Sequence, residues 1–177
     1  MKELKFFSKE SLIDIIVISI IGTILHFAFE FSGGNLLVAL FSAVNESVWE
    51  HIKIAVMAIY IVSLVKMAVK EKREYNLWTS LFFKFVTAII LIPLLYYTYK
   101  AIFIVENLAI DMLIFYVSII ISRLVEVIIQ NKFKVSAKVE DVYKYLNIAI
   151  IIFFVIFTFF PPKLDIFKDK LNNKYGI

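Results

Sequence analysis

The chain contains no cysteine. Disulfide bonds, thiolate metal sites and cysteine nucleophiles are therefore excluded. Two catalytic motifs are also missing, namely the His-Glu-x-x-His helix of zinc proteases and the Gly-x-Ser-x-Gly elbow of serine hydrolases. The sequence has no internal repeat, no low-complexity stretch and no sign of a second domain. These absences direct attention to the apolar character of the chain and to its few ionisable residues.

Hydrophobic residues make up 62% of the 177 positions, and the mean hydropathy is +0.87. Both values lie outside the range of soluble globular proteins and indicate an integral membrane protein. The formal net charge of +4 comes from lysines between the apolar runs, where they report membrane orientation. We therefore expect the lipid bilayer as a partner and no nucleic acid.

The apolar runs predict an all-α fold, a polytopic membrane helix bundle that forms a single domain. The predicted spans cover residues 12–31, 46–69, 78–99, 108–130 and 145–160, and a polar tail covers residues 163–177. The first run lacks an Ala-x-Ala cleavage site, so we interpret it as a span and not as a signal peptide. Gly33 and Gly34 end this first span. Residues 36–44 are apolar but too few to cross a bilayer, so we expect a short re-entrant or interfacial helix there.

The distribution of lysine and arginine predicts the orientation. The amino terminus and the connections around residues 66–73 and 132–144 are basic, whereas residues 32–50 contain neither lysine nor arginine. By the positive-inside rule the amino terminus is cytoplasmic. Five crossings then place the carboxyl terminus outside.

The best candidate site lies where the first span meets the second. His26 and Glu30 are four residues apart, and so are Glu46 and Glu50, which His51 follows directly. Because residues with this spacing share a helix face, we expect the two pairs to face each other. Imidazole and carboxylate groups suit zinc, iron or manganese. The pattern predicts a divalent metal held by His26, Glu30, Glu50 and His51, with Glu46 and Glu50 as the catalytic carboxylates.

Two further residues support this site, and a structural explanation competes with it. Asp111 of the fourth span falls at the same depth. Asn45 is a favourable helix N-cap, and the helix dipole favours carboxylates such as Glu46 and Glu50 in the first turns. Capping alone would explain Asn45 and Glu46. It does not explain Glu30, which lies at the carboxyl end of its helix, where the dipole disfavours a carboxylate.

A second set of ionisable residues falls nearer the cytoplasmic side. It consists of Asp14, Lys84, Arg123 and Glu126. Its charges balance, so we predict buried ion pairs that hold the helices together, a structural polar network.

Three functions remain open at this point. The first is a metal-dependent membrane hydrolase that acts on a lipid-like substrate. The second is a proton- or cation-coupled transporter or channel, with a small ion passing between the two polar layers. The third is a structural or interaction protein whose polar residues only join helices.

Several short motifs resemble a family of small multi-pass bacterial membrane proteins that is known only as a domain of unknown function. They are Leu25-His26-Phe27, Glu30, Ser32-Gly33-Gly34-Asn35, the block Asn45-Glu46-Ser47-Val48-Trp49-Glu50-His51, and the tail residues Phe159-Phe160-Pro161-Pro162, Phe167, Asp169 and Tyr175-Gly176-Ile177. The resemblance implies a bacterial cytoplasmic membrane protein. It also suggests that the tail folds back over the candidate site as a lid; the alternative is a disordered, charged extension. Lys170 and Asn173 depart from the pattern, since proline and glycine are more usual there.

Overall fold

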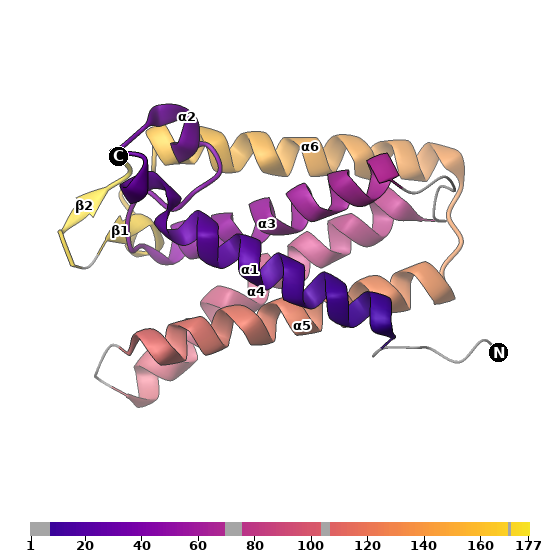
Figure 1. Ribbon diagram of the computed structural model, residues 1–177, viewed down its shortest axis with the longest axis horizontal. Helices are drawn as coiled ribbons and strands as arrows, with labels where there is room; N and C mark the ends of the chain where they lie inside the picture. Colours follow the sequence, from indigo (N-terminus) through magenta and orange to yellow (C-terminus); the bar gives the residue numbers. More distant parts are fainter. Residues whose placement is uncertain (1–7, 70–75, 104–106, 170) are drawn as a thin grey trace.

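A computed structural model describes residues 8–69, 76–103, 107–169 and 171–177 of the chain. The predicted all-α fold is confirmed, with a small two-stranded hairpin in the tail (Figure 1). The helices are α1 (Lys9–Phe31), α2 (Leu36–Ala39), α3 (Val48–Val69), α4 (Leu77–Ile102), α5 (Leu108–Lys132), α6 (Ala137–Phe159) and the short 3-10 helix η1 (Asp165–Phe167). The strands are β1 (Lys168–Asp169) and β2 (Lys174–Tyr175).

Five of the helices, α1, α3, α4, α5 and α6, are long and apolar enough to cross a membrane. They run side by side in alternating directions (Figure 1). Helix α3 is central: 56% of its apolar segment is buried, against 17% in α1 and in α6. It packs against α1 and α4, and α4 packs in turn against α5 and α6. The apolar side chains that α1 and α6 leave exposed would face lipid.

Polar residues at the helix starts explain where several helices begin. The Ser8 hydroxyl accepts a hydrogen bond from the Ser11 N–H at the start of α1, and the Asn107 side chain accepts one from the Ala109 N–H at the start of α5. Such N-caps satisfy backbone donors that have no partner within the helix. Helix α4 instead receives its cap from another helix, because the Glu140 carboxylate of α6 accepts hydrogen bonds from two N–H groups in its first turn.

Helix α6 begins at Ala137, whereas the sequence predicted a span from residue 145. The charged residues before 145 had indicated a connection. In the structure they form the first turns of the helix, and one of them, Glu140, makes the cap on α4. The change from charged to apolar residues therefore marks where α6 enters the apolar layer of the membrane, and not the first residue of the helix.

The two ends of the bundle differ. We call the end that carries α2, η1, β1 and β2 the tail end; α1 begins at the opposite end (Figure 1). In the tail, the Phe167 ring is buried against the Trp49 ring of α3, with 4.5 Å between the ring centroids. Asn173 adopts φ of +55° in the turn between β1 and β2, a conformation that asparagine tolerates better than most residues. A tight turn therefore forms without glycine; Lys170 lies outside the described residues.

Candidate metal centre

Ser47, and not Asn45, caps the start of α3. The Ser47 hydroxyl accepts a hydrogen bond from the Glu50 N–H at 3.3 Å, and the Ser47 carbonyl accepts from the Glu50 and His51 N–H groups. The Asn45 side chain lies one step earlier: its oxygen accepts from the Ser47 N–H, and its Nδ2 donates to the Gly176 carbonyl of the tail, both at 2.9 Å. Asn45 thus joins the loop before α3 to the tail.

Three side chains converge at the tail end, one from α1, one from this loop and one from α3. Glu46 Oε2 lies 3.6 Å from His51 Nε2 and 3.9 Å from His26 Nε2. The two imidazole rings are 5.2 Å apart between centroids. One ligand atom from each residue lies within 4.8 Å of the other two. We call His26, Glu46 and His51 the His/Glu cluster.

The orientation of the His51 ring favours metal binding. His51 Nδ1 lies 2.9 Å from the Ser47 carbonyl. Since a carbonyl can only accept a hydrogen bond, Nδ1 carries the proton and donates it. In the neutral form of the ring, the lone pair of Nε2 is then directed toward Glu46 Oε2, 3.6 Å away. A hydrogen bond from one ring nitrogen to a backbone carbonyl, with the other nitrogen left as a ligand, is the usual arrangement of metal-binding histidines.

The His26 ring is held less firmly. Its Nδ1 is buried and has no hydrogen-bond partner among the described residues. Buried polar atoms of this kind are uncommon in native structures. The imidazole contacts the Phe27 ring at 4.6 Å between centroids. Both histidine side chains are mostly buried, with 12% and 22% exposure, whereas Glu46 is 42% exposed.

Glu50 lies outside the cluster. Its carboxylate is 2.5 Å from Lys53 Nζ in a fully buried ion pair, and it also accepts a hydrogen bond from the Val44 N–H at 3.0 Å. Lys53 in addition donates to the Ala39 carbonyl and the Thr158 hydroxyl. This pair joins α2, α3 and α6 beneath the loop that carries Glu46. The reason for the difference is that α3 begins at Val48, so Glu46 and Glu50 do not share a helix face as the spacing had predicted.

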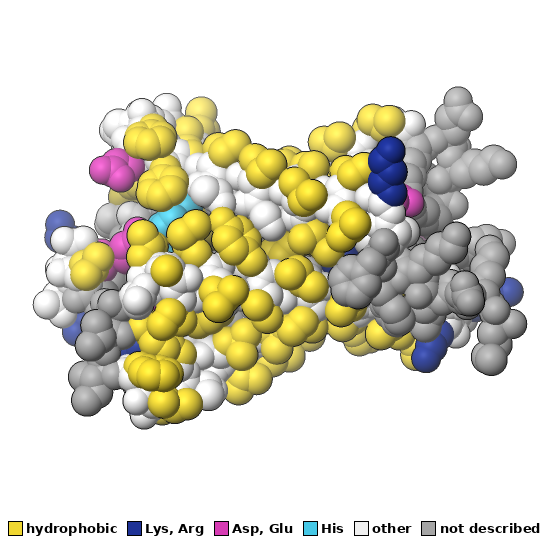
Figure 2. Space-filling view, turned by 60° about the horizontal axis from the view of Figure 1, so that its bottom comes forward, with side chains coloured by type: hydrophobic (Ala, Val, Ile, Leu, Met, Phe, Trp, Pro, Cys, Tyr) yellow, Lys and Arg dark blue, Asp and Glu magenta, His cyan; other side chains and the backbone are white. Residues whose placement is uncertain are grey.

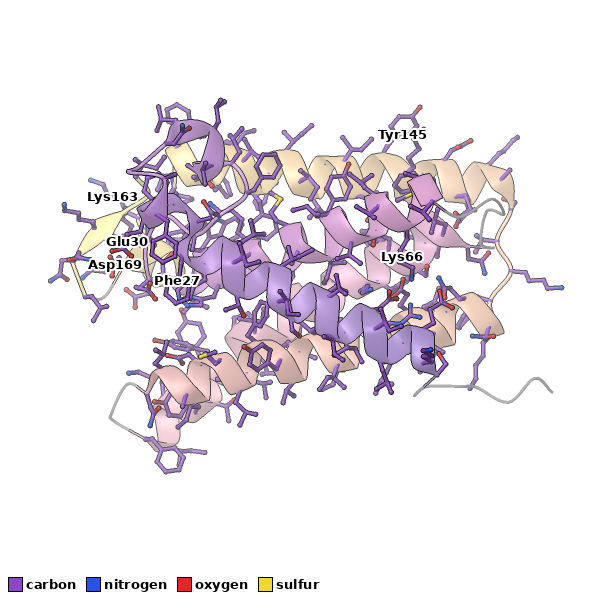
Figure 3. All side chains as sticks on the ribbon, viewed as in Figure 1. Phe27, Glu30, Lys66, Tyr145, Lys163 and Asp169 are labelled. Carbon is purple, nitrogen blue, oxygen red and sulfur yellow. The ribbon has the colours of Figure 1, made fainter. Side chains whose placement is uncertain are left out.

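Glu30 is also apart from the cluster, one helical turn beyond His26 on α1. Its side chain is exposed, and the group of residues that could hold an ion does not include it. Figure 3 shows Glu30 with Phe27 and Asp169 at the tail end, far from Lys66. The structure therefore offers three candidate ligands, of which the sequence had named His26 and His51 as ligands and Glu46 as catalytic.

Two hollows adjoin the cluster, and His51 and Asp111 line both of them. The larger, of about 210 Å³, also contacts Glu46, apolar residues of α4 and α5, and Leu171 of the tail. The smaller, of about 50 Å³, lies between α1 and α5 and contacts His26. A carboxylate and three candidate ligands thus border space that a substrate could occupy.

The predicted structural network lies toward the opposite end of the bundle. Lys84 Nζ and Arg123 Nη1 lie 2.6 and 2.7 Å from Glu126 Oε2. Asp14 Oδ2 lies 3.3 Å from Arg123 Nη1 and 2.6 Å from Lys66 Nζ. The sequence analysis had not included Lys66. Its depth in the membrane could have identified it. Since α1 and α3 run in opposite directions, the end of α3, which carries Lys66, lies beside the start of α1, which carries Asp14. We call these five residues the ion-pair network.

No curated protein and no solved structure matches the chain. A family model does match, and it covers residues 1–177. The chain belongs to DUF6512, a family of unknown function.

Proposed function

We propose that the protein is a metal-dependent hydrolase embedded in a bacterial cytoplasmic membrane. The observation that carries this proposal is the His/Glu cluster, in which His51 Nε2 and a carboxylate oxygen of Glu46 face each other at 3.6 Å while His51 Nδ1 is held by the Ser47 carbonyl. A cation between two such atoms, either a proton on Nε2 or a metal ion, offsets the repulsion of their lone pairs. We propose that a zinc, iron or manganese ion is that cation, because imidazole and carboxylate ligands suit these metals.

Two of the three ligand separations are close to those of a zinc site. Ligand atoms of a tetrahedral zinc site lie about 3.3 Å apart, as follows from zinc–ligand distances of about 2.0–2.1 Å. The corresponding separations here are 3.6 and 3.9 Å from Glu46 Oε2 to the two imidazoles. Two histidines and one glutamate leave the fourth position for water, which is the arrangement of catalytic zinc sites.

A bound ion would activate a water molecule for attack on an ester-like bond, and Asp111 would take its proton. Asp111 suits this role because its side chain lines both hollows beside His51. The sequence had offered Glu46 and Glu50 for catalysis, but Glu46 is here a metal ligand, and Glu50 lines neither hollow and is paired with Lys53. We assign Glu50 a positioning role, since it holds the Val44 N–H in the loop that carries Glu46.

The transporter alternative has less support. On α1, His26 and Asp14 are twelve residues apart in sequence, which corresponds to about 18 Å of helix. The buried side chains between these depths include the apolar Ile18, Phe115 and Ile119, and the hydroxyl of Ser118, which donates to the Ile114 carbonyl. An ion path would have to cross this mostly apolar layer to reach the ion-pair network.

The proposal includes the orientation. The His/Glu cluster lies at the tail end and would face the outside, while the amino terminus would be cytoplasmic. The connections at the other end of the bundle supply most of the lysines and arginines near helix ends, as the positive-inside rule requires.

Elemental analysis of detergent-purified protein after incubation with Zn²⁺ tests the metal site. We expect about one ion per chain in the parent and in Glu30→Gln, which changes an exposed carboxylate on the same helix as His26, and a loss of most of the metal in Glu46→Gln. A parent without metal, or a Glu46→Gln variant that retains it, would contradict the proposal.

Turnover of a panel of p-nitrophenyl carboxylate and phosphate esters tests the chemistry. We expect Asp111→Asn to retain the metal and to lose at least a hundredfold in rate, as removal of a general base does. If Asp111→Asn hydrolyses the same ester at the parent's rate, Asp111 is not the base.

A further inference from the structure

The smaller hollow extends from the His/Glu cluster along the seam between α1 and α5. At the tail end it begins at His26 and His51. It is closed one helical turn deeper, at Gly22, where a Cβ atom would lie 2.3 Å from the Phe115 ring. That turn corresponds to about 6 Å along the helix. The hollow thus leads from the cluster toward the middle of the bundle.

The walls of this hollow are apolar apart from His26, His51, Asp111 and the hydroxyl groups of Thr23 and Tyr116. Phe27 and Met112 flank it from α1 and α5. The two hydroxyl groups in the wall satisfy each other, since Thr23 Oγ1 donates to the Ser19 carbonyl and lies 3.3 Å from the Tyr116 hydroxyl. Both hydroxyl protons are therefore used within the wall, so neither hydroxyl has a proton left to donate to a ligand.

The hollow also faces the side of the bundle that would contact lipid. Phe27 is 41% exposed and Met112 is 38% exposed, although both belong to apolar helices. Figure 2 shows this side: histidine atoms are visible among hydrophobic side chains, near acidic residues at the same end. A molecule in the hydrocarbon layer could reach the cluster sideways, without passing through water.

We propose that the substrate is a membrane amphiphile with one hydrocarbon chain next to its polar group. Its polar group would lie in the larger hollow beside Glu46 and His51, and the first methylenes of its chain would lie between α1 and α5. This inference rests on the proposed function, since it names the substrate of that site.

Three features support an amphiphile over a water-soluble ester. The two hollows share His51, Leu108, Asp111 and Phe115, so one molecule can occupy both. The direction from the cluster to Gly22 is the direction in which a lipid chain runs from its head group to the bilayer centre. The smaller hollow, of about 50 Å³, lies against mostly apolar side chains, which suits a hydrocarbon chain.

Two probes with the same chain test the inference: lysophosphatidate, which has a phosphate monoester, and the uncharged monoacylglycerol. Binding to the full-length protein in detergent is measured by native mass spectrometry, and the metal content is measured on the same samples. Met112→Trp fills the hollow with a larger side chain. Leu113→Trp is the matched control, because the next residue of α5 is 59% exposed and does not line the hollow.

We expect Met112→Trp to weaken the binding of both probes about tenfold and to leave the metal content unchanged, while Leu113→Trp changes neither. We also expect removal of the metal with a chelator to weaken lysophosphatidate but not monoacylglycerol. Equal binding to Met112→Trp and Leu113→Trp would overturn the inference. If no variant holds metal but Met112→Trp still loses both probes, the hollow binds the chain and the hydrolase proposal fails.

Discussion

The ion-pair network and the His/Glu cluster both place ionisable side chains in an apolar bundle, but they balance charge differently. In the network every carboxylate lies within 3.3 Å of a lysine or arginine nitrogen, as Glu126 does with Lys84 and Arg123 and Asp14 does with Arg123 and Lys66. In the cluster Glu46 faces two imidazoles at 3.6 and 3.9 Å, beyond hydrogen-bond distance.

This difference separates a structural role from a functional one. Charges removed from water are stable only when paired and hydrogen-bonded, and the network meets this condition by joining α1, α3, α4 and α5. The cluster does not meet it with the described residues alone. Its half-exposed carboxylate, the His51 imidazole that the Ser47 carbonyl orients, and the His26 imidazole could instead offer lone pairs to a ligand. The predictions below test this contrast.

The largest effect is expected from Glu126→Gln. The substitution leaves Lys84 and Arg123 buried without the carboxylate that both contact. Breaking a buried pair in this way costs about 3–5 kcal/mol. Chemical unfolding in detergent measures the loss, and the metal content of the folded fraction should not change.

Lys134→Gln serves as the control for this experiment, because Lys134 is exposed at the same end of the bundle. A substitution at such a site changes stability by about 0.5 kcal/mol or less. An effect of Glu126→Gln as small as that of Lys134→Gln would mean that the network does not hold the helices together.

A smaller effect is expected from Asn45→Ala, which removes two hydrogen bonds of the Asn45 side chain. One is to the Ser47 N–H within the loop before α3, and the other is to the Gly176 carbonyl of the tail. Each is worth about 0.5–1.5 kcal/mol, so we expect a loss of about 1–2 kcal/mol in unfolding free energy. Trypsin should also cleave faster at Lys174 in β2. Asn131→Ala, which removes a hydrogen bond to the Val127 carbonyl far from the tail, should leave that cleavage rate unchanged.

Much of the fold follows from the sequence because long apolar runs specify helices of bilayer length. The boundaries follow less well where charged residues continue a helix, as Glu140 shows in α6. The pairing of Asp14, Lys84, Arg123 and Glu126 follows from depth and charge balance. Lys66 was missed because it lies near the end of α3, where a lysine is expected for reasons of topology alone.

The residues of the candidate site were less predictable than the fold, for a local reason. A spacing of four places Glu46 and Glu50 on one face only if the helix has already begun at residue 46. The Ser47 hydroxyl caps α3, so the helix begins two residues after Glu46. Glu46 therefore lies in the loop, where its side chain approaches His26. Glu50 then faces inward to Lys53, and its neighbour His51 faces α1. A single cap thus decides which carboxylate joins the histidines.

The smallest effect on the metal-free protein is expected from Glu46→Gln. Glu46 is 42% exposed and has no lysine or arginine near it within the described chain, so its loss should change stability by about 0.5 kcal/mol or less. Added zinc should then change the unfolding free energy of the parent and of Glu46→Gln by different amounts. At a hundredfold excess over its dissociation constant, a ligand of the native state stabilises the protein by about 2.7 kcal/mol. We expect this gain in the parent and in Glu30→Gln, and none in Glu46→Gln.

Unfolding with and without Zn²⁺, and with Zn²⁺ plus a chelator, measures this gain. A Glu46→Gln variant that loses several kcal/mol in the absence of metal would place the His/Glu cluster in the same class as the ion-pair network, as a structural contact. A parent that gains nothing from zinc would lead to the same conclusion by another route, because three lone pairs that attract no cation have no catalytic role of the kind proposed. The His/Glu cluster differs in role from the ion-pair network only if two results are obtained together: Glu46→Gln is as stable as the parent without metal, and zinc stabilises the parent.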